Sequence, residues 1–519
     1  MTSWDTGAGL EMDIPFRELG TLERFYIARN NLKFFNSSTV TAIYQLPASL
    51  SKQSLLNLPY FKALIYKSVA STILAHPFLS VSIEGESSAN PRWIHLSRIN
   101  LSKVVQFVHV NPENGIETFI EEGLQRGFEN EAEGKGPLWR VFMASPGFTD
   151  ETNRATAPGD QDIINLAVGF FFHHAICDGL SGASFHKTFQ SHLNSLLASA
   201  TLSDFGSKCV NPTTIETLLE VPRQLLPPNM EEAINLTTSI SFLLRRLFLA
   251  VLYPTDRLKW TGPLIPQNIP PRRLARIKSF SLDSEVTEKL VTRCRKEKTT
   301  ITALTTVLLA RESAQIFATE KSSRFEVPIA ISMRRFAVAH SGVTDDTIGV
   351  YVSAAKPIFS CENPTPRGYI SCCSPSSPGL EGSDEQLWDS ARETRQYIAT
   401  ATNSPADQDI GALKLVRDFQ KYFTGLLGGK RQSAFLLTNL GVVEGTSGDR
   451  DLTAKATLSK LFFANMPSMY DGPLLLAMAT VKGGDMTLCL GSERGVIRED
   501  HVNIIRNNLE HRLRSIANE

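Results

Sequence analysis

Apolar and polar residues alternate along this chain in segments that predict a succession of strands and helices. In Leu19–Arg29 and Pro59–Ala75 the apolar residues recur at helical spacing, which predicts a short helix with Thr21 as its N-cap and a longer amphipathic helix. Thr39–Leu46 is rich in β-branched residues and predicts a strand. Up to residue 200 we further expect strands at Leu79–Ile83, Pro137–Met143 and Ile163–Phe172, and a helix at Leu180–Leu197.

A second succession of the same kind begins near residue 275. It predicts strands at Ala275–Leu282, Phe325–Ser332 and Ala434–Leu440, helices at Ser284–Lys296 and Ile301–Thr319, and a hairpin of Leu474–Val481 and Asp485–Leu490 that turns at Gly483-Gly484. Polar stretches at Pro146–Asp162 and Glu362–Gln386 are expected to be loops. The pattern predicts an α/β fold with an N-terminal half at 1–200, a connecting segment at 201–274 and a C-terminal half at 275–519.

The connecting segment contains one strongly apolar stretch, Ser239–Tyr253, which is interrupted only by Arg245 and Arg246. At this length it falls short of the roughly 20 residues that a helix needs to cross a bilayer. We favour a helix that packs within the fold. A helix that rests on a membrane surface is the alternative.

Composition narrows the classes of function. The chain has 519 residues, of which 42% are hydrophobic and 20% charged, and its 53 basic residues balance its 53 acidic ones, so we expect no nucleic-acid partner. Seven cysteines without a CxxC pair predict neither a metal site nor a disulfide framework. The acidic N-terminus lacks the apolar core of a secretory signal. We therefore expect a cytoplasmic protein, with peripheral attachment to a membrane or lipid-droplet surface as the alternative.

The clearest chemical signal is the stretch from His173 to Gly179, which reads HHAICDG. It lies between the predicted strand that ends at Phe172 and the predicted helix that begins at Leu180. Histidine titrates near neutrality, so it is well suited to accept a proton from a hydroxyl group. A single histidine at a strand end is more often structural. Two histidines followed by Asp178 and glycine in a strand–turn–helix setting form a much more specific pattern.

This stretch matches the HHxxxDG signature of the CoA-dependent acyltransferase superfamily, which includes chloramphenicol acetyltransferase, plant BAHD enzymes and condensation domains. Other blocks, in the right order, resemble the fungal alcohol acetyltransferase family from about residue 17 to 492: LGTLERFYIAR, PLWRVFM, SMRRF, DDTIGVYVS and TNLGVVEG. The DFGWG motif of the plant branch is absent, and Tyr470–Pro473 is only a faint echo of it.

The resemblance implies two chloramphenicol-acetyltransferase-like subdomains with mixed sheets and a tunnel between them. An acyl group, most readily acetyl, would pass from acyl-CoA to the hydroxyl of a small-molecule alcohol. His174 would be the general base, without a covalent enzyme intermediate. We expect acyl-CoA as a co-substrate, no bound cofactor, and a monomer.

The remaining residues of the motif would support His174. Asp178 would orient the loop, Gly179 would allow the sharp turn, and His173 would be a packing or hydrogen-bonding neighbour. Arg140 and Arg334 are both candidate partners of Asp178 and candidate substrate-binding residues. Thr438 and Asn439 could polarise the thioester carbonyl or could simply form a turn.

Two other functions compete with an O-acyltransferase. A condensation-type enzyme would use a carrier-protein thioester and form an amide or ester; the absence of a carrier-like region before Glu519 favours the CoA enzyme. A non-catalytic binding protein is disfavoured by the intact His174 and Asp178. The acceptor stays open between a short-chain alcohol and a large natural-product hydroxyl.

Overall fold

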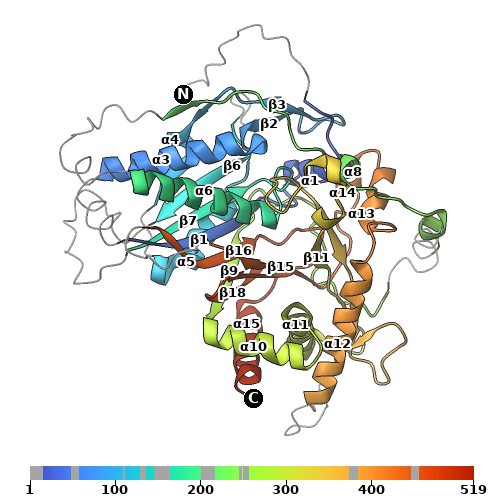
Figure 1. Cartoon of the computed structure of the whole chain (residues 1–519). Helices are drawn as coiled ribbons and strands as arrows, with labels where there is room; N and C mark the ends of the chain where they lie inside the picture. Colours follow the sequence, from blue (N-terminus) through green and yellow to red (C-terminus); the bar gives the residue numbers. More distant parts are fainter. Residues whose placement is uncertain are drawn as a thin grey trace.

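The computed structural model contains two main β-sheets with helices packed around them (Figure 1). It describes residues 16–47, 58–108, 112–128, 136–144, 164–199, 217–244, 248, 256–372, 384–445 and 455–519. This mixed α/β architecture confirms the expected fold class. The division into two subdomains and the tunnel between them stay predictions.

The first sheet has five strands in the order β16-β1-β7-β6-β5. Its members are β16 (Thr457–Asn465), β1 (Ser38–Leu46), β7 (Ile164–Phe172), β6 (Trp139–Ala144) and β5 (Val105–Phe107), antiparallel except for the β5–β6 pair. Successive side chains of β7 point alternately into two apolar clusters, so both faces of this sheet are buried. Phe170 and Phe172 join the cluster that contains Phe185 of α6 (Gly179–Ser199), and Phe171 joins the cluster that contains Phe119 of α5 (Pro112–Gln125).

The second sheet has six strands in the order β12-β11-β15-β17-β18-β9. These are β12 (Val352–Ala355), β11 (Ile329–Ser332), β15 (Phe435–Val443), β17 (Leu474–Val481), β18 (Met486–Glu493) and β9 (Ala275–Leu282). The β11–β15 and β15–β17 pairs are parallel and the others antiparallel. Beside this sheet lie the helices α10 (Ser284–Lys296), α11 (Ile301–Phe317), α12 (Asp384–Ala401) and α15 (Glu499–Asn518) (Figure 1).

The remaining helices and strands complete the described chain. The helices are α1 (Thr21–Asn31), α3 (Leu58–Ala75), α4 (Leu101–Val104), α8 (Met230–Ala233), α13 (Asp409–Ala412) and α14 (Phe419–Thr424). The 3₁₀ helices are η1 (Pro77–Ser80), η3 (Arg334–Phe336), η4 (Ala339–Ser341) and η5 (Leu413–Leu415). The strands are β2 (Val81–Glu84), β3 (Arg92–His95), β4 (Arg98–Asn100), β8 (Leu218–Glu220), β10 (Arg324–Glu326), β13 (Ile358–Ser360) and β14 (Ile370–Ser371).

Most predicted elements are confirmed, and the boundaries of the strand Ala275–Leu282 and the helix Ser284–Lys296 match residue for residue. Several expectations are wrong in detail. Gly20, not Thr21, is the N-cap of α1, and its N–H donates to Glu23. The strand expected at Phe325–Ser332 is divided between β10 and β11, with Pro328, which has no N–H to donate, in the gap.

The third difference is at Leu79–Ile83, where η1 occupies the first two residues before β2 begins. The loop expected at Glu362–Gln386 gives way to α12 at Asp384 and contains the short strand β14. The loop expected at Pro146–Asp162 lies outside the described residues.

The apolar stretch Ser239–Tyr253 departs most from expectation. Residues 240–244 are helical, and the side chains of Ile240, Leu244 and Phe248 are 76%, 60% and 56% exposed. The expectation that this helix packs into the core is wrong for these three side chains. Among the helices of the described ranges, none combines the length and the apolar content that crossing a bilayer requires.

The two halves of the sequence interlock. β16 belongs to the C-terminal half but pairs with β1 in the first sheet. Conversely, α5 of the N-terminal half covers the edge of β9 in the C-terminal half. Glu121 Oε1 accepts the N–H of Ile277 at 2.8 Å, and Glu117 Oε1 accepts the N–H of Ser279 at 2.6 Å. An open sheet edge would otherwise leave such N–H groups unpaired.

We predict that Glu121→Ala destabilises the protein by about 1–3 kcal/mol, because the buried N–H of Ile277 loses its acceptor. Urea denaturation measures the change. Glu122→Ala is the matched control, because Glu122 is its exposed neighbour on α5. Equal stability of the two variants would contradict this role of Glu121.

Candidate active site

The motif forms the turn between β7 and α6. β7 ends at Phe172, and the N–H of His173 then donates to the carbonyl of Leu138 at 2.8 Å. The N–H of Ile176 donates to the carbonyl of His173 at 3.2 Å, which closes the turn. Helix α6 begins at Gly179. The turn therefore carries the two histidines from a buried central strand to the start of a buried helix.

Asp178 is the best-connected residue of this turn. Its Oδ1 accepts the N–H of Ser181 at 3.0 Å, as an N-cap of α6 does. The guanidinium of Arg334 binds both carboxylate oxygens, at 2.6 Å to Oδ2 and 3.0 Å to Oδ1. The N–H of Tyr351 donates to Oδ2 at 3.1 Å. Each side chain of the Asp178–Arg334 pair is only 1% exposed.

This pairing decides between the two arginine candidates. Arg140 instead donates to the carbonyls of Arg126 and Gly127 and lies over the ring of Phe128 at 4.4 Å. Burial by itself would raise the pKa of Asp178, but Arg334 and the backbone donors outweigh burial and lower that pKa. Asp178 is therefore a carboxylate that holds the turn, and Arg334 is its counter-ion.

His174 lies against an aromatic wall. Its ring stacks on Tyr26 of α1, with centroids 4.1 Å apart and planes 7° from parallel, and lies 5.8 Å from the ring of Phe35. Its Nδ1 is enclosed by protein atoms, and no other described residue hydrogen-bonds to that nitrogen. We therefore expect an approaching group to meet Nε2 rather than Nδ1.

The surroundings keep His174 neutral. Burial lowers the pKa of His174 to about 3, and the positive charge of Arg29 on α1 lowers it as well. A neutral imidazole is the form that can accept a proton. His174 is thus an uncharged imidazole throughout the physiological pH range.

His173 has a different environment. Its Nδ1 accepts the N–H of Ala175 at 3.0 Å, so its proton is assigned to Nε2. Nε2 lies 3.7 Å from Oε1 of Glu86, which follows β2. His173 is fully buried. This geometry agrees with the expected packing and hydrogen-bonding role.

The other motif residues are packed. A Cβ on Gly179 would lie 2.5 Å from Leu440 of β15 and 2.9 Å from Phe463 of β16, so close packing, rather than a left-handed backbone, requires glycine here. Burial raises the pKa of the Cys177 thiol well above its usual value, which makes it a poor nucleophile. Within the described ranges, no three His, Cys, Asp or Glu side chains cluster as metal ligands would.

Thr438 and Asn439 lie on β15, directly before the Leu440 that packs against Gly179. Both are half-buried. The amide of Asn439 donates to Thr302 Oγ1 of α11 at 3.0 Å and accepts the N–H of Gly441 at 2.8 Å. The fold brings both residues near the motif turn, and their contact with substrate stays a prediction.

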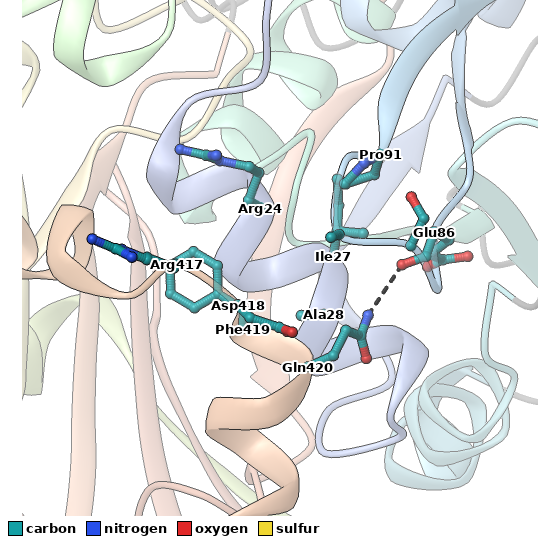
Figure 2. Close-up of a pocket in the computed structure, with 11 residues that line it drawn as sticks. Arg24, Ile27, Ala28, Glu86, Pro91, Arg417, Asp418, Phe419 and Gln420 are labelled. Carbon is teal, nitrogen blue, oxygen red and sulfur yellow. Dashed lines mark hydrogen bonds between the residues drawn. The ribbon is translucent and has the colours of Figure 1, made fainter.

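A surface pocket lined partly by α1 lies near the motif turn (Figure 2). It encloses about 320 Å³ of space open to solvent and is lined by α1, the turn after β2, and the start of α14. Glu86 forms part of its wall, and Figure 2 shows Gln420 joined to Glu86 by a hydrogen bond to the backbone carbonyl, at 3.1 Å. Oε1 of Glu86 also lies 3.7 Å from Nε2 of His173, so the side chain of Glu86 connects this pocket to the motif.

Sequence reasoning missed the residues that surround His174. The pattern at Leu19–Arg29 predicts a helix but gives no role to Tyr26 or Arg29. Arg29 lies one turn beyond Tyr26 on the same face, so a charged residue on an apolar helix face was the available signal. No local pattern marked Glu86 or Phe35.

The class of enzyme follows from comparison of the whole chain with known families. Residues 18–508 match the family described as alcohol acetyltransferase (AATase). The chain therefore belongs to the alcohol acetyltransferase family, and it is an acyltransferase. This family membership confirms the resemblance that the sequence blocks indicated.

Individual relatives span the full chain. "Probable alcohol acetyltransferase FCK4" of Fusarium pseudograminearum is 26% identical over 508 residues, covering 97% of this chain and 96% of the relative. "Probable alcohol acetyltransferase crmB" of Aspergillus fumigatus is 24% identical over 502 residues, covering 94% and 97%.

Solved structures share the fold. The TRI3 trichothecene 15-O-acetyltransferase of Fusarium sporotrichioides matches with a TM-score of 0.66 at 12% identity, over 96% of this chain and 94% of that one. The first condensation domain of the calcium-dependent antibiotic synthetase matches with a TM-score of 0.57 at 10% identity, over 98% of each chain. The fold is thus common to acetyltransferases and condensation domains.

We predict that Asp178→Asn destabilises the protein by about 3–5 kcal/mol, because it leaves the buried charge of Arg334 unpaired. In the wild type, the contribution of this pair to the free energy of unfolding is fully present above the unfolded-state pKa of Asp178, about 3.9. The contribution is lost as the pH falls through the folded-state pKa of Asp178, which is lower. Urea denaturation at pH 7 measures the loss. The control is Asp346→Asn, which removes an exposed pair with Lys187. A loss no larger than that of the control would show that the pair does not hold the turn.

Proposed function

We propose that this protein transfers an acetyl group from acetyl-CoA to the hydroxyl of an alcohol or natural-product acceptor, with His174 as the general base. The observation that carries the proposal is the environment of His174: neutral, stacked on Tyr26, and beside the Asp178–Arg334 pair. Family membership supports acyl transfer and the use of acyl-CoA as co-substrate.

The proposed reaction needs one base and no covalent enzyme intermediate. Nε2 of His174 accepts the acceptor's hydroxyl proton as the oxygen attacks the thioester carbonyl. The tetrahedral intermediate then collapses, the carbon–sulfur bond breaks, and the imidazolium returns the proton to the CoA thiolate. The products are the ester and CoA. Cys177 is unsuited to form an acyl-enzyme, because it is buried and burial raises its pKa.

Asp178 and Arg334 act on this reaction indirectly. Their charges neutralise one another, and their hydrogen bonds to Ser181 and Tyr351 fix the turn that presents His174. Thr438 and Asn439 are proposed to lie near the thioester carbonyl, where a hydroxyl or amide N–H would stabilise the developing oxyanion. Arg140 makes none of these contacts.

A condensation-type reaction with a carrier-protein thioester is the alternative. The shared fold keeps it in consideration, whereas membership of the alcohol acetyltransferase family favours the CoA donor. The two donors present the same thioester carbonyl, so His174 would have the same role in both. The donor requirement can therefore be tested separately from the base.

We predict that His174→Ala lowers kcat by about 10²-fold or more, because the acceptor hydroxyl loses its base. CoA release from acetyl-CoA with an acceptor panel measures turnover, and the melting midpoint checks the fold. His340→Ala, which changes an exposed histidine, is the control and should retain activity.

Near-normal turnover by a folded His174→Ala variant would contradict the assignment of the base. Transfer from an acetylated carrier protein, combined with none from acetyl-CoA, would instead support the condensation-type alternative.

We further propose that the protein is cytoplasmic and monomeric and contacts membranes peripherally through Ile240, Leu244 and Phe248. Ile240 and Leu244 are four residues apart in the helical stretch 240–244, so they share one face, and Phe248 is exposed as well. Arg245 and Arg246 follow Leu244 directly in the sequence. Exposed apolar residues combined with basic ones favour attachment to the surface of an anionic bilayer.

We predict that the triple change of Ile240, Leu244 and Phe248 to serine abolishes flotation with anionic liposomes and leaves the melting midpoint unchanged, because the side chains are exposed in the folded protein. Leu415→Ser, which alters an exposed leucine elsewhere, is the control. Absence of wild-type flotation, or a large drop in the melting midpoint, would contradict surface attachment.

A further inference from the structure

Arg29 of α1 lies among the aromatic rings that surround His174. Its guanidinium is 4.6 Å from the centroid of Tyr26 and 4.4 Å from that of Phe35. These are the rings that lie 4.1 Å and 5.8 Å from the imidazole of His174. A guanidinium over an aromatic face gains both cation–π attraction and stacking contact. Arg29 therefore touches both rings that form the wall behind His174.

The C-terminal half anchors this guanidinium. Its NH1 atom donates to Oδ2 of Asp471, in the segment before β17, at 3.2 Å. The Arg29 side chain is only 7% exposed, and its Nε is fully enclosed without a hydrogen-bond partner in the described structure. Burying a cation that has a single ionic contact lowers the stability of the fold. Arg29 is such a cation, and it lies next to the proposed base, His174.

The backbone at Arg29 also organises the wall. Its carbonyl accepts the N–H of Phe34 at 2.9 Å and that of Phe35 at 3.2 Å. These bonds bring the chain after α1 back toward the helix, so that Phe35 lies beside Tyr26. A change of the Arg29 side chain leaves these backbone bonds available, which separates the role of the guanidinium from the path of the chain.

We propose that Arg29, anchored by Asp471, is a positioning residue that holds Tyr26 and Phe35 against His174 and so fixes the imidazole for proton transfer. The inference rests on the proposed function of His174. Arg29 acts through the two rings and does not touch the reacting atoms. A loose ring would spend part of its time out of line with the acceptor hydroxyl, which lowers the rate of the chemical step.

The charge of Arg29 provides a second readout. The charged groups that act on His174 are Arg29 from α1 and His173 and Asp178 from its own turn, while Asp471 partly balances Arg29. Burial is the main cause of the low pKa of His174, and Arg29 adds to it. Loss of the guanidinium should therefore raise the pKa of His174 partway toward its ordinary value.

The test uses the full chain with Arg29→Met, which keeps an unbranched side chain and removes the charge. We expect kcat to fall by at least about tenfold, with little change in KM for acetyl-CoA or the acceptor. We also expect the ¹³C resonance of the His174 ring, assigned with His174→Ala, to titrate at a higher pH than in the wild type. Arg29→Lys should restore part of kcat. Arg98→Met, at an exposed position on β4, should behave as the wild type.

Unchanged kcat in folded Arg29→Met, or superimposed His174 titration curves, would overturn the inference. If Arg29→Met fails to fold, Asp471→Asn replaces it: kcat must fall at a temperature where this variant is still folded, and wild-type kcat there would refute the anchor. If the wild type transfers no acetyl group from acetyl-CoA, the proposed function fails, and the titration still decides whether Arg29 acts on His174.

Discussion

The carboxylate of Asp178 and the guanidinium of Arg334 form a buried pair on which the geometry of the motif turn depends. Asp178 comes from the turn before α6, and Arg334 begins the 3₁₀ helix η3 after β11, so the pair ties the first sheet to the second. Removing both charges from water is expensive, and two ionic contacts alone would not offset the loss of hydration. Additional hydrogen bonds from Ser181 and Tyr351 make the arrangement stable.

His174, the proposed base, has a different kind of support. It makes no ion pair with the residues that the structure describes; it stacks on Tyr26 and is enclosed on its Nδ1 side. A neutral ring has little need of hydrogen bonds to hold it, so aromatic contact can fix its plane without changing its charge. The site therefore separates two tasks: an ionic network holds the backbone of the turn, and an aromatic wall orients the imidazole.

Both supports cross between the halves of the sequence. Asp471 follows β16 yet contacts Arg29 of α1, while α5 supplies carboxylates to the edge of β9. β16 itself pairs with β1. These exchanges mean that the surroundings of the motif turn are assembled from distant segments of one chain, and that neither half alone contains all the groups around His174.

The sequence by itself determined the strand–turn–helix unit at His173–Gly179, most strands and helices, and the family, because these depend on residues a few positions apart. It did not determine which arginine pairs with Asp178: Arg334 lies 156 positions away, and Arg140 was an equal candidate. Tertiary structure also decided that Tyr26, Phe35 and Arg29 lie around His174, and that Ile240, Leu244 and Phe248 face outward. Periodicity identifies an apolar face, but only the packing of the whole chain decides what that face meets.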